Sequence, residues 1–295
     1  MLSTKRTLLI IAFLSALLQV AVSEHNLSIL DQGELILTAD SPSYMNPPKN
    51  FAEEGVWKDN FKGPSSYVQR PPFYGIIYLI TYLTVEDPLL VLKWIQYGVM
   101  GIGIYCFGLL VYHLTHSSRT AYSSLIIFGS LPLFHGFVGY VMTESIAPYL
   151  LIILTYAFLT SYKENKNVWL FIVMCLIIPL FRTQLILFPL VLSLLYISNK
   201  GLRKSWILLS LLPFILWQIN VYVKMGSFQL HPIYASANET IYQPPHEALS
   251  ELFRVWEHEG ENLHSVVGIL RSDPTKKGVD DALQFVPNKF RGDVK

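Results

Sequence analysis

Residues 88–113 read PLLVLKWIQYGVMGIGIYCFGLLVYH, an apolar run long enough for one helix to cross a lipid bilayer. A helix rises about 1.5 Å per residue, so about 20 residues cover the hydrocarbon layer. Similar apolar blocks lie at residues 121–141, 145–162, 167–181, 183–198 and 206–223, and another lies near the N-terminus. The pattern predicts an all-α polytopic membrane protein with about seven transmembrane helices.

The composition favours the same class. Hydrophobic residues make up 52% of the chain and charged residues only 15%, whereas soluble domains carry about 25% charged residues. The formal net charge is +1 and no basic block is present, so we expect no nucleic-acid partner. Cys106 and Cys175 both lie in apolar runs, which favours buried free thiols over a disulfide or a metal site.

The N-terminal residues 1–26, MLSTKRTLLIIAFLSALLQVAVSEHN, have a basic start, an apolar core and a small-residue end. Both a cleaved signal peptide and a retained transmembrane helix of about 17 residues fit this pattern. The spans that follow favour the retained helix. Either interpretation sends residue 24 onward to the outside.

Basic residues predict the topology, because cytoplasmic loops of membrane proteins are enriched in Lys and Arg. They gather in four groups between the apolar blocks: Lys5 and Arg6; Arg119; Lys163 and Lys166; Lys200, Arg203 and Lys204. If all four groups are cytoplasmic, the N-terminus is inside and a long loop over 24–72 is external. We therefore expect a transmembrane domain over 1–225 and a small external soluble segment over 226–295.

The external segment 226–295 is polar, and we expect helices near residues 244–260 and 278–290. Its histidines match no metal-binding spacing. The stretch that begins at Arg70, RPPFYGIIYLITYL, is apolar and starts with two prolines, which predicts a partly embedded helix.

Charged residues beside the predicted spans are candidates for chemistry. Asp40, Arg70, Glu144 and Arg182 all fall on the predicted outer face. A carboxylate can deprotonate an acceptor hydroxyl, and a guanidinium fork can bind a phosphate. Simpler roles stay open: Asp40 as a turn or cap residue, Glu144 as a helix-start residue, and Arg182 as a snorkelling side chain.

The chemistry of these groups fits a substrate with a lipid tail in the bilayer and a phosphate at its surface. The sequence has neither G-x-x-x-x-G-K-[S/T] nor G-x-G-x-x-G, which argues against a nucleotide as direct donor. It has neither H-E-x-x-H nor C-x-x-C, and we expect no cofactor.

Residues 39–61, ADSPSYMNPPKNFAEEGVWKDNF, and 69–83, QRPPFYGIIYLITYL, resemble the first external loop of GT-C membrane glycosyltransferases. The likeness is to dolichyl-phosphate-mannose–protein mannosyltransferases and bacterial lipid A aminoarabinose transferases. Residues 142–159, MTESIAPYLLIILTYAFL, and 181–197, FRTQLILFPLVLSLLYI, are similar to later span junctions of that family. The likeness covers roughly residues 5–225.

The resemblance implies a polyprenyl-phosphate-linked sugar as donor, and a glycan, a lipid or a protein as acceptor on the non-cytoplasmic side. It implies that Asp40 and Glu144 are catalytic, and that Tyr44, Arg70 and Arg182 bind substrate. Some relatives hold a divalent metal through an acidic residue just before the basic-Pro-Pro motif. Here that position is Gln69, so a metal is not expected.

Relatives continue through several more spans, so this chain is either a short variant or a truncated copy. We expect it in the cytoplasmic membrane of a bacterium rather than in the ER membrane. The other interpretations are a transporter or flippase of a lipid-linked or anionic substrate, and a non-catalytic membrane subunit. Against a transporter, the sequence lacks paired halves with interrupted helices.

Overall fold

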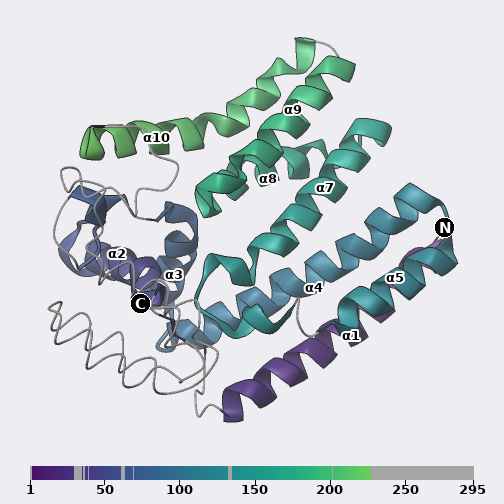
Figure 1. Ribbon diagram of the computed structural model, residues 1–295, viewed down its shortest axis with the longest axis horizontal. Helices are drawn as coiled ribbons and strands as arrows, with labels where there is room; N and C mark the ends of the chain where they lie inside the picture. The colour runs from purple at the N-terminus through teal and green to yellow at the C-terminus, as the bar shows by residue number, and fades with distance from the viewer. Residues whose placement is uncertain are drawn as a thin grey trace, which may run out of the picture. The chain divides into compact units, whose positions relative to one another are not determined.

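A computed structural model describes residues 2–29, 35, 37–38, 40–60, 64–68, 70–131, 135–200 and 202–226. All of them belong to Met1–Ser236, the first of two units into which the chain divides. The predicted C-terminal helices, the C-terminal histidines and Gln69 lie outside the described residues. Within the described ranges the chain forms α-helices, short 3-10 turns, a longer 3-10 helix over Leu202–Leu211, and no β-strand (Figure 1). The all-α prediction is confirmed for this part of the chain.

The α-helices are α1 (Leu2–Ile29), α2 (Ser41–Glu54), α3 (Pro72–Thr84), α4 (Pro88–Thr115), α5 (Ser118–Ser130), α7 (Ala147–Glu164), α8 (Val168–Phe181), α9 (Leu187–Lys200) and α10 (Leu212–Met225). Several of them, α2, α3, α4, α7 and α10, carry a proline in the first turn. Proline suits this position because its missing N–H would have no partner inside the helix. Helix α2 lies inside the predicted external loop 24–72, so that segment is partly helical.

Four helical segments in the described part of the chain are long and apolar enough to cross a membrane. They are Ser3–Ser28, Pro88–Thr115, Thr183–Lys200 and Ile207–Met225. Helices α3 and α8 are apolar but shorter. These segments indicate a membrane protein, while the count of seven spans and the sides of the loops stay predictions.

The predicted helical span over 121–141 is wrong in its second half. Helix α5 ends at Ser130, and residues 136–139 form a 3-10 turn instead. Beyond the helix end, the buried ring of His135 contacts the Phe128 carbonyl oxygen through Nε2 at 3.0 Å and the Tyr149 hydroxyl through Nδ1 at 2.6 Å. The Phe128 carbonyl also accepts from the Leu131 N–H at 3.3 Å, so the His135 ring adds a second hydrogen bond at the end of α5.

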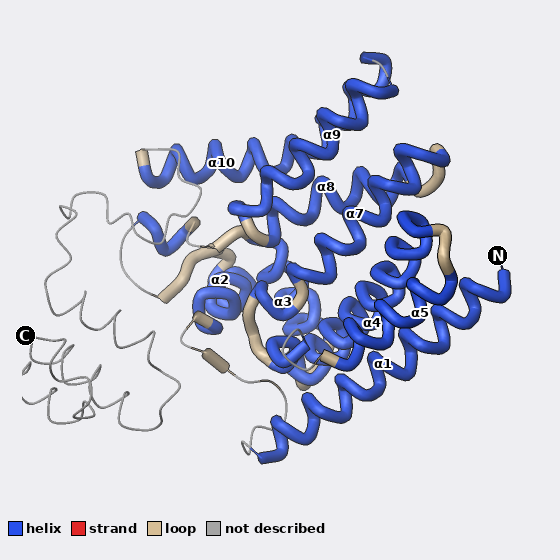
Figure 2. The backbone as a smooth tube through the Cα atoms, turned by 45° about the vertical axis from the view of Figure 1, so that its right-hand side comes forward, coloured by secondary structure: helices blue, strands red, loops and turns tan. Residues whose placement is uncertain are grey.

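Helix α4 lies between α1 and α5 on one side and α7 on the other (Figures 1 and 2). Beyond α7, helix α8 packs against α3, α9 and α10. Two contacts are close enough to require glycine. A Cβ on Gly103 would lie 2.5 Å from the Tyr149 Cβ, and one on Gly129 would lie 2.5 Å from the Ser15 Cβ. Small residues of this kind let membrane helices approach each other closely.

Successive long helices run in opposite directions, so the turns that connect them lie alternately at the two ends of the bundle. At one end Thr4 of α1 is hydrogen-bonded to Ser118 of α5 at 3.2 Å, and His113 of α4 lies 3.4 Å from Glu164 of α7. This end holds the start of α1, the α4–α5 turn, the start of α5 with Arg119, and the α7–α8 turn. The predicted site residues lie at the opposite end.

Candidate functional site

Each of the predicted site residues lies at or near a helix boundary. Asp40 occupies the N-cap position of α2 with Tyr44 in that helix, Arg70 comes shortly before α3, Glu144 lies in the 3-10 turn before α7, and Arg182 is the C-cap of α8. Apolar helices favour this arrangement, because charged groups are stable only where they reach water or a partner. The structure brings all of these residues into one connected cluster.

The first part of the cluster is an ion pair between Asp40 and Arg70. Arg70 Nη2 lies 3.0 Å from Asp40 Oδ2, and Arg70 Nε donates to Ser43 Oγ at 2.9 Å. The Asp40 carboxylate makes no capping hydrogen bond to α2, so a simple cap role does not describe it. The Arg70 side chain is 13% exposed and the Asp40 side chain 43% exposed, so Asp40 is the member of the pair that a ligand can reach.

Tyr44 connects this pair to the rest of the site. Its ring is buried under the Arg70 guanidinium, which lies 4.9 Å from the ring centroid. Its hydroxyl is 3.2 Å from Thr143 Oγ1. Burial raises the pKa of Tyr44, although the nearby Arg70 charge opposes the change. Tyr44 is thus a neutral hydrogen-bonding group inside the protein, and its position favours an effect through Arg70 and Thr143 over direct contact with a ligand.

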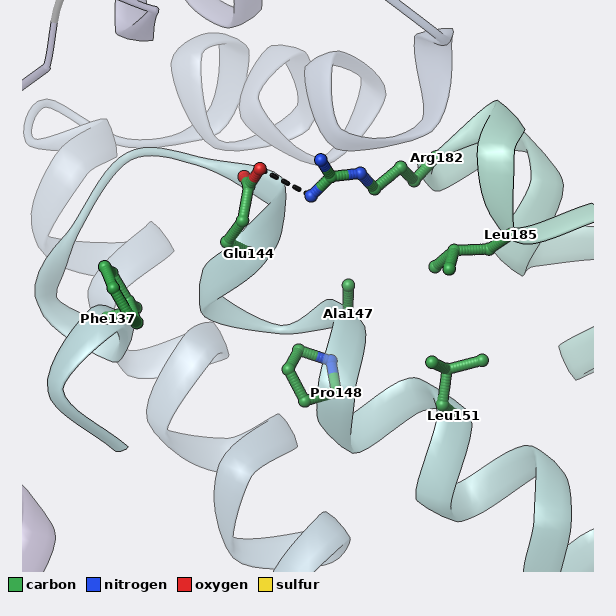
Figure 3. Close-up of a pocket in the computed structure, with 7 residues that line it drawn as sticks. All are labelled: Phe137, Glu144, Ala147, Pro148, Leu151, Arg182 and Leu185. Carbon is green, nitrogen blue, oxygen red and sulfur yellow. Dashed lines mark hydrogen bonds and ion pairs between the residues drawn. The ribbon is translucent and has the colours of Figure 1, made fainter. Parts of the chain in front are cut away.

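The second part of the cluster is an ion pair between Glu144 and Arg182. Thr143 Oγ1 donates to Glu144 Oε2 at 3.1 Å, and Arg182 Nη1 donates to Glu144 Oε1 (Figure 3). Because the Thr143 proton goes to Glu144, the Tyr44 hydroxyl is the donor to Thr143. Two hydrogen bonds therefore run in one direction from Tyr44 through Thr143 to Glu144, which strengthens each of them. The cation–π contact between Tyr44 and Arg70 joins them to the first ion pair.

An apolar cavity of about 470 Å³ lies beside the second pair. Its lining residues are Phe137, Glu144, Ala147, Pro148, Leu151, Arg182 and Leu185 (Figure 3). The apolar walls come from the first turns of α7, the turn after α8 and the segment before α7, and the ion pair supplies the charged wall. Ligand pockets usually have volumes of about 300–1,000 Å³. The site can therefore hold an apolar chain next to an anionic group.

Three residues that connect the site were not predicted from the sequence: Ser43, Thr143 and Gln96. Ser43 and Thr143 are small polar residues of a kind common in loops, so the sequence carries no signal for them. Gln96 has a signal, because it is a polar residue inside the apolar run 88–113. Polar groups inside a membrane helix are costly and commonly functional.

Among the described residues, no group of three or more His, Cys, Asp or Glu side chains is placed to hold a metal ion. No family model matches the chain, and no curated protein or solved structure matches it. The proposed function therefore rests on the cluster of charged residues and on the cavity beside it.

Proposed function

We propose that this chain is a membrane glycosyltransferase of the GT-C type, which moves a sugar from a polyprenyl-phosphate carrier to an acceptor hydroxyl. One observation carries the proposal: two carboxylate–guanidinium pairs are joined through Tyr44 and Thr143, and the second pair, Glu144 with Arg182, lines an apolar cavity. This combination suits a ligand that is both phosphorylated and lipid-linked. The resemblance of residues 39–61 and 69–83 to the first external loop of that family supports it.

Arg182 is the residue that we expect to bind the donor phosphate. Its side chain is 34% exposed and lines the cavity, whereas the Arg70 side chain is more enclosed. As the bond between the sugar and the phosphate breaks, negative charge grows on the phosphate oxygen. A fixed guanidinium stabilises that charge. Glu144 holds the Arg182 guanidinium in place, and Arg70 does the same for the Asp40 carboxylate.

Asp40 is the residue that we expect to act as the general base. The acceptor oxygen attacks the anomeric carbon, its proton passes to Asp40, and the electron pair of the breaking bond leaves on the polyprenyl phosphate. Inversion at the anomeric carbon is what the family resemblance implies. The proposed reaction uses groups of the chain itself, and the acceptor can be a glycan, a lipid or a protein.

The proposal includes seven crossings with the N-terminus inside and the site on the non-cytoplasmic face. Residues 24–72 and 226–295 are then external. The opposite directions of successive helices support this topology, as does the separation of Arg119 and the α7–α8 turn from the site cluster. The proposed location is the cytoplasmic membrane of a bacterium.

The test is release of free polyprenyl phosphate when the purified chain is incubated with polyprenyl-phosphate sugars and a hydroxyl acceptor. A positioned base contributes about 10²–10⁴-fold to a rate, so Asp40→Asn should lower turnover by that order and leave donor binding nearly unchanged. Asp87→Asn is the matched control, because Asp87 caps α4 by accepting from the Leu90 N–H at 2.9 Å. Asparagine caps helices as well as aspartate does.

Wild-type turnover in Asp40→Asn would reject the role of Asp40 as the base and leave it as a turn residue. Two other results would reject the proposed activity itself. Movement of the intact lipid-linked sugar across a vesicle membrane, without release of the lipid phosphate, would assign a flippase. An intact protein that neither binds polyprenyl phosphate nor moves a sugar would be a non-catalytic subunit.

A further inference from the structure

Gln96 of α4 is fully buried, and its side-chain amide makes four hydrogen bonds. Its Oε1 accepts from the Tyr74 hydroxyl and from Ser145 Oγ, both at 2.8 Å. Its Nε2 donates to the Val138 carbonyl oxygen at 2.8 Å and to the Tyr140 carbonyl oxygen at 3.3 Å. One side chain thus satisfies its own polar atoms and holds groups from two other parts of the chain.

Three of these four partners belong to the segment 136–145, which leads into α7. This segment consists of two short 3-10 turns and extended residues instead of an α-helix. Irregular backbone in an apolar environment needs partners from the protein, because no water is present to satisfy its carbonyl groups. Gln96 supplies donors to two of those carbonyls. The segment also carries both Glu144 and the cavity residue Phe137.

The fourth partner connects Gln96 to the opposite wall of the site. The Tyr74 ring packs edge-on against Phe181, with ring centroids 5.6 Å apart, and Phe181 directly precedes Arg182. The same ring packs edge-on against Tyr44, with centroids 5.2 Å apart. Gln96 is therefore hydrogen-bonded to Ser145, next to Glu144, and through Tyr74 it supports the aromatic contact next to Arg182.

We infer that Gln96 is a positioning residue, which fixes the segment 136–145 and so sets the geometry between Glu144 and Arg182. The role of that geometry in binding a lipid phosphate rests on the proposed function. The hydrogen-bond network itself does not, and the two can be tested separately.

The test measures the distance across the cavity in the full chain, reconstituted in lipid nanodiscs. Spin labels at Phe137→Cys and Leu185→Cys report it, since these residues lie on opposite walls (Figure 3). The native Cys106 and Cys175 are buried and should not be labelled. Wild-type background should give one narrow distance peak. Gln96→Leu, which removes all four hydrogen bonds, should lose that peak.

Gln19→Leu is the matched control. Gln19 is also a buried amide in an apolar helix, and its Nε2 donates to the Gly129 carbonyl oxygen at 2.7 Å, in α5 and not in the segment 136–145. The same substitution there should keep the narrow peak. If Gln96→Leu fails to fold, Gln96→Glu carries the test, because it keeps the acceptor oxygen and side-chain length but loses the amide donor.

Loss of the narrow peak in the Gln96 variants alone would support the inference. A narrow peak in all variants, or equal broadening in the Gln96 and Gln19 variants, would overturn it. The affinity for polyprenyl phosphate is measured on unlabelled samples that keep Phe137 and Leu185, and it should fall only in the Gln96 variants. Failure of the wild-type chain to bind this lipid would reject the proposed function, while the distance measurement would still decide the role of Gln96.

Discussion

Removing the Arg182 guanidinium should have a small effect on the stability of the fold and a larger effect on the binding of polyprenyl phosphate. The Glu144 and Arg182 side chains are 42% and 34% exposed, so water screens their attraction. Ion pairs with this exposure contribute about 0–1 kcal/mol to folding. Arg182→Ala should therefore lower the free energy of unfolding by no more than about 1 kcal/mol.

The effect on ligand binding should be larger. A hydrogen bond to a charged group contributes about 1.5–3 kcal/mol when the partner is enclosed by the protein. At about 1.4 kcal/mol for each tenfold change, Arg182→Ala should weaken binding of polyprenyl phosphate by roughly ten- to a hundredfold. Arg182→Lys should fall between wild type and Arg182→Ala, because it keeps the charge and loses the planar fork.

The assay pairs thermal unfolding in detergent with equilibrium binding of a fluorescent polyprenyl phosphate. Arg119→Ala is the control, because Arg119 is an exposed arginine at the other end of the bundle and its removal should change neither quantity. Unchanged affinity in Arg182→Ala, with the protein still folded, would show that Arg182 is only a snorkelling side chain. Equal losses in Arg182→Ala and Arg119→Ala would indicate a general charge effect.

Two further predictions concern topology and the attachment of α1. Glu54 and Lys166 are both exposed, and they lie on opposite sides of the membrane in the seven-crossing proposal. A membrane-impermeant maleimide should therefore label Glu54→Cys in intact cells and Lys166→Cys only after permeabilisation. Labelling of both residues from one side would contradict the topology. Lys93 Nζ lies 3.0 Å from Glu24 Oε1, with side chains 4% and 40% exposed. Glu24→Ala removes one partner of the buried ammonium, whereas Lys93→Met leaves a carboxylate that water reaches. Glu24→Ala should therefore lower the free energy of unfolding more than Lys93→Met does, and the reverse order would contradict this interpretation.

The sequence by itself determined the fold class and the ends of most helices. Long apolar blocks can satisfy their backbone groups in a membrane only as helices, so composition and block length were sufficient. Proline residues such as Pro72 and Pro88 mark helix starts through local sterics. Asp40, Arg70, Glu144 and Arg182 could be assigned to one face of the bundle, because charged residues between apolar blocks lie near helix ends.

Only the tertiary structure decided which of these residues are partners. Asp40 pairs with Arg70, and Glu144 pairs with Arg182, across gaps in sequence that no local pattern encodes. The partner of each carboxylate depends on how closely the helices approach, as at Gly103, where a Cβ would meet Tyr149 at 2.5 Å.

The path of the chain after α5 was also decided by tertiary contacts. Pro132, two residues after the end of α5 at Ser130, is a local signal for a helix end, but it does not determine where the chain goes next. The segment after α5 is held by buried side chains: His135 adds a hydrogen bond to the Phe128 carbonyl, and Gln96 donates to the Val138 carbonyl. Those partners come together only when the helices pack, and that packing is what brings Glu144 to Arg182.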